Sequence, residues 1–382
     1  MDAPAESAAR AEIVVDLDAI RHNVTRLRIS TGATTADGPQ LMVVVKADGY
    51  GHGMVPVARA AREAGADWLG VATLDEAVAL RGSGDSGRLM CWLASPGEDY
   101  RPALEQDVDV AAYTPGQVAE IAAAARAVGT PARVHLKFDT GLSRGGASRA
   151  DWQGLIDAAL AASPDVVPVG LWSHLARSDD PGHPANVAQE TVFREAVALA
   201  EAAGVRPEVR HLANSAAALL RPSARFDLVR CGIATYGLSP APAVATSADL
   251  GLVAAMTVRG TVVMGRDLAA GDGVSYGHTF VAPEPMHVAL VPMGYGDGIP
   301  RHASSTAQVQ VGGQRARVLG RICMDQFVVA APQAQAGDAV VLFGPGDDGE
   351  PTAQDWAQWC DTISYEIVTR IGGRQQRRWI HT

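Results

Sequence analysis

Short, wholly apolar runs recur along the first two-thirds of the chain, and an Ala-rich stretch with helical spacing lies between most of them. Unbroken apolar runs of this kind are typical of strands that are buried on both faces, as the strands of parallel sheets are. Eight such runs occur, at residues 41–45, 68–72, 89–93, 108–112, 134–138, 167–172, 209–212 and 228–229. Eight alternations of strand and helix over about 250 residues predict an α/β fold, a TIM (β/α)8 barrel.

The clearest helix precedes the first of these runs. Leu17, Ile20, Val24 and Leu27 repeat at helical spacing. Asp16 stands directly before them, where a helix N-cap is expected. The pattern predicts an amphipathic helix that begins after Asp16.

The pattern changes beyond residue 247. Ala-rich stretches give way to Val-rich runs broken by Gly, Asp and Pro, at residues 258–264, 287–291, 307–311, 327–330 and 339–343. Such short runs between turn residues predict a compact, mainly-β domain. We therefore expect a barrel over residues 12–247 and a C-terminal β domain over residues 248–382, with residues 1–11 either flexible or joined to the β domain.

Charge narrows the choice of partners. The chain carries 42 acidic and 32 basic side chains, a formal net charge of −10. An acidic surface repels nucleic acid, so we expect no nucleic-acid partner. The one basic run, residues 374–378, is too short for a binding face and is expected to be a solvated tail or a subunit contact.

Cysteine usage and the absence of targeting signals indicate a compartment. The four cysteines form no CxxC pair and no disulfide framework, which favours free thiols in a reducing compartment. The first eleven residues lack the cationic and apolar segments of a secretion signal, and no apolar stretch approaches the ~20 residues that a membrane span needs. We expect a cytoplasmic protein with no membrane segment.

The ends of the predicted strands carry the candidate chemistry, because TIM barrels place their active sites there. Lys46 follows the first strand directly, where burial would lower its pKa and make its amine a nucleophile. An ordinary strand-end lysine at the surface is the alternative. The glycines of the following Gly49–Gly53 segment favour the first interpretation, because they let backbone approach a ligand closely.

Other strand ends carry polar groups with two possible roles. Lys137 ends the fifth strand and Arg144 follows it, while His174 ends the sixth and is either structural or catalytic. After the seventh strand, Ser215 is placed as a helix N-cap or as a phosphate ligand. TIM barrels often bind phosphate after strands seven and eight, which points to Ser215, Gly232 and Ile233. His spacings match no common zinc pattern, so no metal site is expected.

Eight motifs along the chain occur in a characteristic order: VVVKADGYGHG, KFDTGLSR, WSHLA, HLANSA, RCGI, GVSYG, GRICMDQ and TISYE. In order and spacing they resemble the alanine racemase family. The resemblance runs from about Asp16 to Ile367, and eight motifs in sequence are far more specific than one short pattern. It implies a fold-type III pyridoxal-phosphate (PLP) enzyme with a TIM barrel followed by a β domain.

The resemblance implies which residues hold the cofactor. Lys46 matches the lysine that bonds covalently to PLP and acts as one catalytic base. Arg230 matches the arginine that faces the pyridine nitrogen, and His174 matches the histidine packed beside it. The full matched set for the cofactor is Lys46, Tyr50, His174, Asn214, Ser215, Arg230, Gly232, Ile233 and Tyr365.

Further residues match groups that act on the substrate. Tyr276 matches the second catalytic base, and Arg144 with the backbone at Met324 matches the groups that hold the substrate carboxylate. Lys137 matches a lysine that is often carbamylated, which supplies a negative partner to Arg144. The matched supporting residues are Lys137, Cys323, Asp325 and Tyr295.

Together these matches imply a reaction and an assembly. Racemisation removes a proton from one face of the substrate Cα and returns it to the other, so Lys46 and Tyr276 form a two-base pair. The resemblance implies interconversion of L- and D-alanine, with D-alanine used in the cell wall. It also implies a homodimer in which each β domain completes the partner's active site.

Three alternatives stay open. A racemase of serine, lysine or a broader range differs by pocket size alone, and one methylene is worth only about 1–3 kcal/mol in an apolar pocket. A PLP-dependent decarboxylase shares this architecture, but Arg230 and Tyr276 argue against it. A non-catalytic PLP-binding protein would lack the β domain with its motifs.

Overall fold

The computed structural model describes residues 10–382, and the described residues form two compact units. Residues 20–49 and 53–252 form one, here called the barrel unit. Residues 10–19, 50–52 and 253–382 form the other, here called the sheet unit. For residues 1–9, the expectation of a segment that is flexible or joined to the β domain lies outside the described residues.

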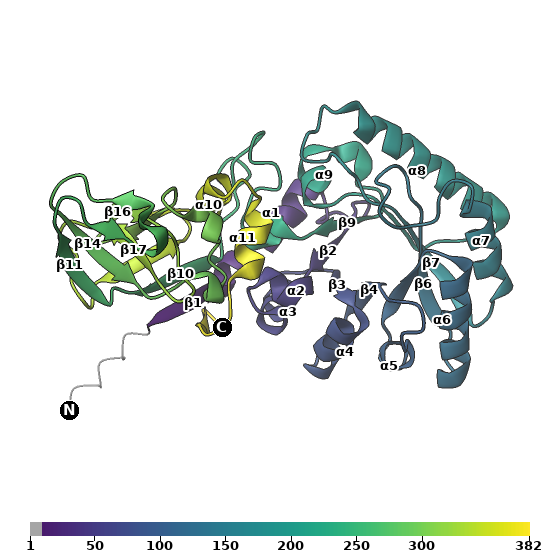
Figure 1. The fold of residues 1–382 in the computed structure, drawn as a ribbon. Helices are drawn as coiled ribbons and strands as arrows, with labels where there is room; N and C mark the ends of the chain where they lie inside the picture. Colours follow the sequence, from purple (N-terminus) through teal and green to yellow (C-terminus); the bar gives the residue numbers. More distant parts are fainter. Residues whose placement is uncertain (1–9) are drawn as a thin grey trace. The chain divides into compact units, whose positions relative to one another are not determined.

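The barrel unit is built on eight parallel strands in the order β8-β7-β6-β5-β4-β3-β2-β9 (Figure 1). Backbone hydrogen bonds from Asp227 N to Arg210 O (3.0 Å) and from Arg230 N to Ala213 O (3.0 Å) bridge the two end strands. The strand bounds are β2 Gln40–Val44, β3 Trp68–Thr73, β4 Arg88–Leu93, β5 Asp109–Ala112, β6 Ala132–Lys137, β7 Val166–Trp172, β8 Val209–His211 and β9 Leu228–Cys231. All eight predicted strands are present, because their side chains are buried from both sides.

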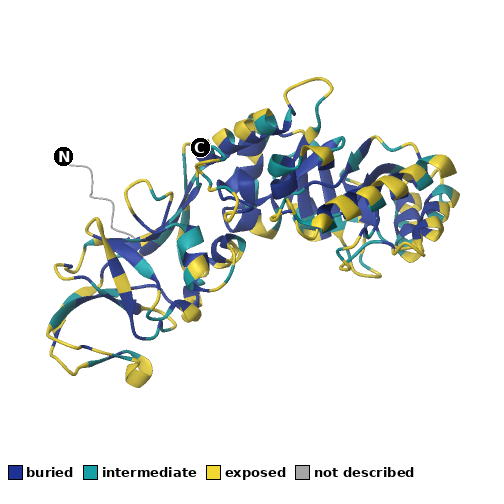
Figure 2. Cartoon of the chain, turned by 90° about the horizontal axis from the view of Figure 1, so that it is seen from above, coloured by how far each residue is buried: buried dark blue, intermediate teal, exposed yellow. Residues whose placement is uncertain are grey.

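Helices alternate with these strands and turn their exposed residues outward (Figure 2). In α6, Pro115 fits the first turn, the Thr114 hydroxyl accepts from Gln117 N, and Gly129 ends the helix in the left-handed conformation. The helices are α1 Leu17–Thr31, α2 Lys46–Tyr50, α3 Met54–Glu63, α4 Leu74–Gly82, α5 Arg101–Leu104, α6 Pro115–Val128, α7 Trp152–Ala161, α8 Pro184–Ala203 and α9 Ser215–Leu220. Asp16 begins α1 as expected, because its carboxylate accepts from Asp18 N (2.8 Å).

The sheet unit contains a nine-stranded sheet in the order β11-β14-β17-β16-β15-β18-β10-β1-β19. The β1–β19 pair is parallel and the other pairs are antiparallel. Its strands are β1 Ala11–Asp16, β10 Met256–Thr261, β11 Met264–Leu268, β14 Met286–Val291, β15 Gln308–Val311, β16 Gln314–Leu319, β17 Phe327–Ala330, β18 Ala339–Phe343 and β19 Gln376–Ile380, and a second sheet pairs β12 Gly273–Val274 with β13 Phe280–Val281. Two helices follow, α10 Ala353–Trp359 and α11 Ser364–Arg370. The predicted architecture, a TIM barrel followed by a mainly-β domain, is confirmed.

Of the two expectations for residues 374–378, the solvated tail is wrong, and the subunit contact stays a prediction. Residues 376–380 form β19, which pairs with β1 in register from Glu12 to Asp16. Arg378 Nε donates to Glu12 Oε2 (3.2 Å), and Arg374 Nε donates to the buried Asp297 (3.1 Å). These acidic partners neutralise the basic run within the sheet unit.

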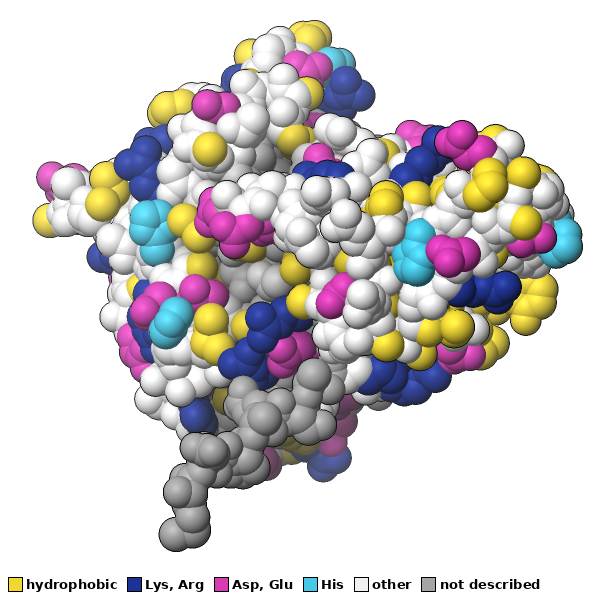
Figure 3. All heavy atoms as spheres, turned by 90° about the vertical axis from the view of Figure 1, so that its left-hand side faces the viewer, with side chains coloured by type: hydrophobic (Ala, Val, Ile, Leu, Met, Phe, Trp, Pro, Cys, Tyr) yellow, Lys and Arg dark blue, Asp and Glu magenta, His cyan; other side chains and the backbone are white. Residues whose placement is uncertain are grey.

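The surface carries both signs of charge. On the face shown in Figure 3, acidic and basic side chains are interspersed with apolar ones. None of the helices between residues 10 and 382 is long and apolar enough to cross a membrane.

Candidate functional site

Lys46 is presented by a left-handed turn at the carboxyl end of β2. Ala47, Asp48 and Gly49 have φ values of 52°, 51° and 61°. A non-glycine residue in this region costs roughly 1 kcal/mol, and such strain is typical of functional sites. Glu76 offsets it, because its carboxylate accepts from Ala47 N (2.7 Å) while it also caps α4.

The Lys46 amine lies in an environment that favours its neutral form. Burial lowers the pKa of Lys46, and the positive charge of Arg144 lowers it further, against the opposing carboxylate of Glu76. The Nζ atom lies 5.9 Å from the centroid of the Trp92 ring. A lysine held in this way is suited to act as a nucleophile and a base near neutral pH.

Lys137 ends β6 and is also buried. Burial, with the charges of Arg144 and Arg230, lowers its pKa to about 8. Its Nζ lies 4.4 Å from the Trp172 ring centroid and 4.7 Å from that of Tyr113. An amine that is partly neutral at pH 7 to 8 is chemically able to add CO2, as carbamylation requires.

Arg144 follows a turn that Asp139 organises. Asp139 Oδ1 accepts from the backbone N–H groups of Gly141 (2.9 Å), Leu142 (3.1 Å) and Ser143 (3.1 Å). Ser143 has a φ of 56°, a conformation in which glycine is unstrained. This carboxylate is occupied by backbone, so the charge of Arg144 stays available to an anion.

Arg230 is buried at the end of β9 among neutral acceptors. Its guanidinium donates to Ser173 O (2.8 Å), Leu212 O (3.0 Å), His211 Nδ1 (2.9 Å) and His174 Nδ1 (3.3 Å). Burial lowers the pKa of Arg230, and burial with the charge of Arg230 holds the pKa of His174 well below its usual value. His174 is therefore neutral, and Arg230 is a fixed cation that cannot give up a proton at neutral pH.

Ser215 has a role different from the expected N-cap. Asn214 is the N-cap of α9, since its side-chain oxygen accepts from Ala217 N (3.2 Å). The Ser215 hydroxyl instead accepts from Gly232 N (2.9 Å) and so ties the loop after β8 to the loop after β9. The predicted phosphate ligands Ser215, Gly232 and Ile233 therefore lie on two joined loops.

The residues at this end of the barrel fit a PLP molecule. Lys46, Lys137, Arg144 and Arg230 are close enough to perturb one another's pKa values, and such a group of cations attracts a phosphate and a carboxylate. The indole N–H of Trp172 is buried without a partner among the described residues, and a bound acceptor would satisfy it. The described residues contain no cluster of three His, Cys, Asp or Glu side chains suited to a metal ion.

In the sheet unit, four predicted site residues lie on loops held together by hydrogen bonds. Tyr295 N donates to Cys323 O (3.0 Å), and Gly296 N donates to Met324 O (2.8 Å). Ser275, beside Tyr276, donates its hydroxyl to Arg321 O (2.6 Å). Tyr276, Tyr295 and Met324 are exposed by 72%, 42% and 54%, which is unusual for such apolar side chains.

Two further contacts organise predicted site residues of the sheet unit. Asp325 pairs with Arg374 Nη1 (2.7 Å), and Arg374 also pairs with the fully buried Asp297. The rings of Tyr50 and Tyr365 are tilted, with centroids 6.2 Å apart. The contact between Tyr50 and Tyr365 brings together residues that are more than 300 positions apart in the sequence.

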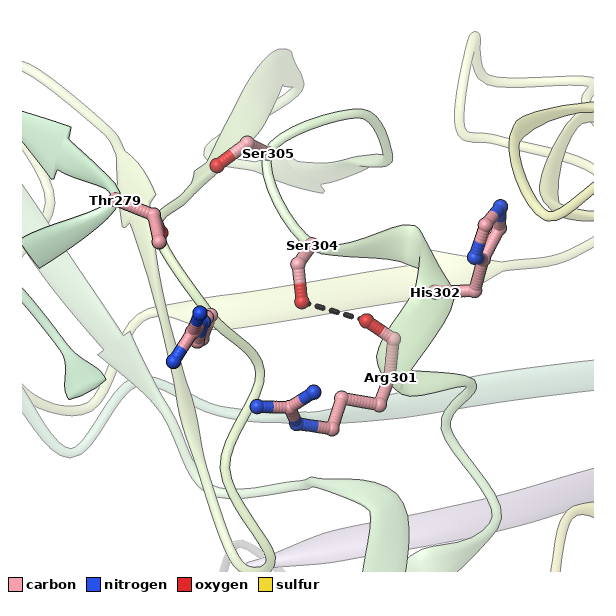
Figure 4. Close-up of a pocket in the computed structure, with 6 residues that line it drawn as sticks. Thr279, Arg301, His302, Ser304 and Ser305 are labelled. Carbon is pink, nitrogen blue, oxygen red and sulfur yellow. Dashed lines mark hydrogen bonds between the residues drawn. The ribbon is translucent and has the colours of Figure 1, made fainter. Parts of the chain in front are cut away.

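Sequence reasoning missed a basic pocket in the sheet unit. Figure 4 shows Ser304 turned toward Arg301, whose carbonyl accepts from the Ser304 hydroxyl (2.6 Å). The pocket has a volume of about 480 Å³, and it is lined by Thr279, Arg301, His302, Ser304, Ser305 and Arg321. The available signal was Arg321 inside GRICMDQ, together with the basic Arg301-His302 pair.

Glu76 and Trp172 were also missed as parts of the site. Glu76 holds the Lys46 turn, and Trp172 lies beside Lys137 and Arg230, whose Cζ is 5.2 Å from the ring centroid. An apolar ring is the expected occupant of a buried strand, so the sequence alone marks Trp172 as a core residue and not as part of the site.

Comparison with known proteins places the whole chain in one family. A family model described as "Alanine racemase, N-terminal domain" matches residues 15–240, and one described as "Alanine racemase, C-terminal domain" matches residues 255–379. The alanine racemase of Streptomyces coelicolor is 53% identical over 389 aligned residues, covering 100% of this chain and 98% of the relative.

Solved structures agree with the sequence comparison. The structure of alanine racemase from D-cycloserine-producing Streptomyces lavendulae has a TM-score of 0.96 and 51% identity, covering 99% of this chain and 98% of that one. A Bartonella henselae alanine racemase with covalently bound pyridoxal phosphate has a TM-score of 0.87 and 27% identity, covering 97% and 100%. The agreement extends through both units, and the chain therefore belongs to the alanine racemase family.

Proposed function

We propose that this chain interconverts L- and D-alanine with PLP, and that Lys46 and Tyr276 are its two proton-carrying side chains. The observation that carries the proposal is the half-buried Lys46 amine, whose pKa is lowered at the mouth of a barrel lined by cations. When bound, PLP supplies the electron-withdrawing ring system that makes the substrate Cα acidic. The proteins similar to this chain are named alanine racemases.

The residues of the barrel unit divide three tasks. Ser215 with the backbone at Gly232 and Ile233 binds the phosphate, together with Asn214 beside it. Arg144 binds the substrate carboxylate, with Lys137 beside it. Arg230 faces the ring nitrogen and withholds a proton from it, because a guanidinium is not an acid at neutral pH.

Lys46 and Tyr276 exchange protons with the substrate Cα on opposite faces. A neutral Lys46 amine takes the proton on one side, and the Tyr276 hydroxyl gives one on the other; the return direction reverses the roles. Cys323 lies beside the loop that carries Tyr276, because its Sγ is 3.2 Å from Ser275 Oγ.

The site is shared between two subunits of a homodimer. Tyr276, Tyr295 and Met324 are large apolar side chains exposed on one chain, and a second subunit would cover them. Each subunit supplies Lys46 to one site and Tyr276 to the other. All four cysteines are free thiols, which supports the cytoplasm as the compartment. The role that goes with the proposed reaction is the supply of D-alanine to the cell wall.

Measured racemisation across a panel of amino acids tests the reaction. With added PLP, L-alanine is expected to be converted fastest, and L-serine and L-lysine more slowly. A faster rate with lysine or serine would assign the chain to that substrate. PLP binding without any turnover would make it a carrier.

A mixture of two inactive variants tests the shared site. Lys46→Ala and Tyr276→Phe chains, each tagged differently, are each expected to lose activity. Co-expressed and purified through both tags, the heterodimer contains one intact site and is expected to recover up to half of the wild-type activity. No recovery in proven heterodimers would refute shared sites.

A further inference from the structure

A row of buried polar side chains crosses the core of the barrel behind Arg230. Arg230 Nη1 lies 2.9 Å from His211 Nδ1, and His211 Nε2 lies 2.9 Å from His135 Nδ1. His135 Nε2 lies 3.2 Å from Asp109 Oδ2. The side chains of His211, His135 and Asp109 are fully buried and Arg230 is 5% exposed, so water does not substitute for any of these contacts.

Donor and acceptor chemistry gives this row a direction. A guanidinium only donates, so His211 Nδ1 accepts and its proton is on Nε2. That proton is donated to His135 Nδ1, which leaves the proton of His135 on Nε2, facing Asp109. Arg230, His211 and His135 therefore each donate to the next member, and the row ends on a carboxylate.

Packing around the row fixes the rings in place. The Trp172 ring stacks on His211 with centroids 5.5 Å apart and planes at 6°. A Cβ atom at Gly170 would lie 2.0 Å from His135 Nδ1, so glycine at that position of β7 leaves the space that His135 occupies. Neither ring can turn over without moving its neighbours.

Asp109 is held as a carboxylate at the far end of the row. Burial alone would raise the pKa of Asp109, but hydrogen bonds from His135 and Arg133 outweigh it, and the pKa is lowered. Arg133 Nε donates to Asp109 Oδ1 (2.9 Å), and the same guanidinium binds both oxygens of Glu208 (2.8 and 2.7 Å). Each Asp109 oxygen thus has its own donor.

We propose that Asp109 and His135 are positioning residues for Arg230, because they set the tautomer that gives Arg230 an acceptor on His211. This inference rests on the proposed function, in which Arg230 faces the ring nitrogen of the cofactor. The four acceptors of Arg230 are neutral, so its orientation depends on lone pairs rather than on a counter-ion. Reversal of the row would set an N–H of His211 against an N–H of Arg230.

Asp109→Asn reverses the row with a minimal change in shape. Arg133 Nε still requires an acceptor, so the new amide turns its oxygen to Arg133 and its NH2 to His135 Nε2. His135 must then carry its proton on Nδ1, and His211 must carry its proton on Nδ1, facing Arg230. Glu208→Gln is the matched control, because it removes one negative charge from the same ion-pair network and leaves the row intact.

Nitrogen-15 NMR of the imidazoles in cofactor-free protein tests the proposal without any turnover. In the wild type and in Glu208→Gln, His135 and His211 are both expected to be neutral with the proton on Nε2. In Asp109→Asn, both are expected to carry it on Nδ1. A wild-type protein with either histidine protonated on Nδ1 would overturn the proposal, and this result needs no variant to fold.

Kinetics supply the second measurement. Asp109→Asn is expected to lower kcat for alanine roughly 10- to 100-fold, the usual effect of a partner that orients a catalytic group, with KM changed little; Glu208→Gln is expected to keep wild-type kcat. Equal kcat in Asp109→Asn and the wild type would refute the positioning role. A wild type with the expected tautomers but no racemisation would instead refute the proposed function.

Discussion

Lys137 provides the sharpest test of the electrostatics at the barrel mouth. Lys137 is 6% exposed, and burial with the charges of Arg144 and Arg230 lowers the pKa of its amine from 10.5 to about 8. Replacing it by the apolar Met removes a buried charge while keeping a long side chain. We expect Lys137→Met to raise the free energy of unfolding at pH 7.

The size of the effect follows from the pKa. The difference between 10.5 and about 8, at roughly 1.4 kcal/mol per pKa unit, makes the charged lysine cost roughly 3 kcal/mol at pH 7. Loss of the cation–π contacts with Trp172 and Tyr113 offsets about 1–2 kcal/mol. A net stabilisation of about 1–2 kcal/mol remains.

The dependence on pH has a defined sign. Below pH 8 Lys137 is charged in both the folded and the unfolded chain, so its full cost is present. Between pH 8 and 10.5 the folded chain has released the proton and the unfolded chain has not, so the free energy of unfolding of the wild type rises with pH. The advantage of Lys137→Met therefore shrinks across this window.

Urea unfolding of cofactor-free protein in CO2-free buffer, at several pH values from 7 to 9.5, measures the difference. Arg149→Met is the matched control, because Arg149 is an exposed cation near a Trp ring, and its effect is expected to be small and independent of pH. A Lys137→Met protein less stable than the wild type at every pH would refute the reasoning. Labelled bicarbonate with carbon-13 NMR then reports whether the wild-type amine is carbamylated.

Three further outcomes are expected. Arg230→Glu should slow racemisation and increase transamination, measured as pyridoxamine phosphate formed per turnover, because a carboxylate can hold a proton on the ring nitrogen; an unchanged product ratio would contradict this. Gly51→Ala should lower the free energy of unfolding by roughly 3 kcal/mol, because a Cβ at this position would lie 2.3 Å from Val368 O and the φ of Gly51 is +80°. Gly129→Ala is the control: its Cβ would meet no atom within 4 Å, and the free energy of unfolding should fall by only about 1 kcal/mol. Removal of residues 375–382 should lower the melting temperature of cofactor-free protein, because it deletes β19; an unchanged melting temperature would mean that the β1–β19 pairing contributes nothing.

The barrel could be predicted because its signal is local. Each strand is an apolar run in its own right, and each helix between them has its own spacing and caps. β1 has the same apolar character at residues 13–15, but its partners β10 and β19 lie more than 200 positions away. Nothing near β1 in the sequence indicates that pairing, so it was not predicted as a strand of the sheet unit.

Where the prediction failed, a hydrogen-bond or ion-pair partner remote in the sequence determined the role of the side chain. Asn214 and Ser215 are both good N-cap residues. The Ser215 hydroxyl accepts a hydrogen bond from Gly232 N, and Asn214 is the residue that caps α9. The basic run near the C-terminus lacked visible counter-ions, because Glu12 and Asp297 come from remote segments. Local chemistry predicts what a side chain can do, and the fold decides which of those roles is used.

The positive charges at the barrel mouth destabilise the folded chain, and the same charges favour the binding of an anion. The carboxylates near it are engaged elsewhere: Glu76 holds the Lys46 turn and Asp139 holds the turn before Arg144. The amines and guanidiniums are therefore left to repel one another, and that repulsion contributes to the lowered pKa values of Lys46 and Lys137. A bound phosphate or carboxylate relieves the repulsion and stabilises the fold through binding. The site is thus least stable without a bound anion, and burial together with the charge of Arg144 lowers the pKa of Lys46, the lysine that we propose exchanges a proton with the substrate.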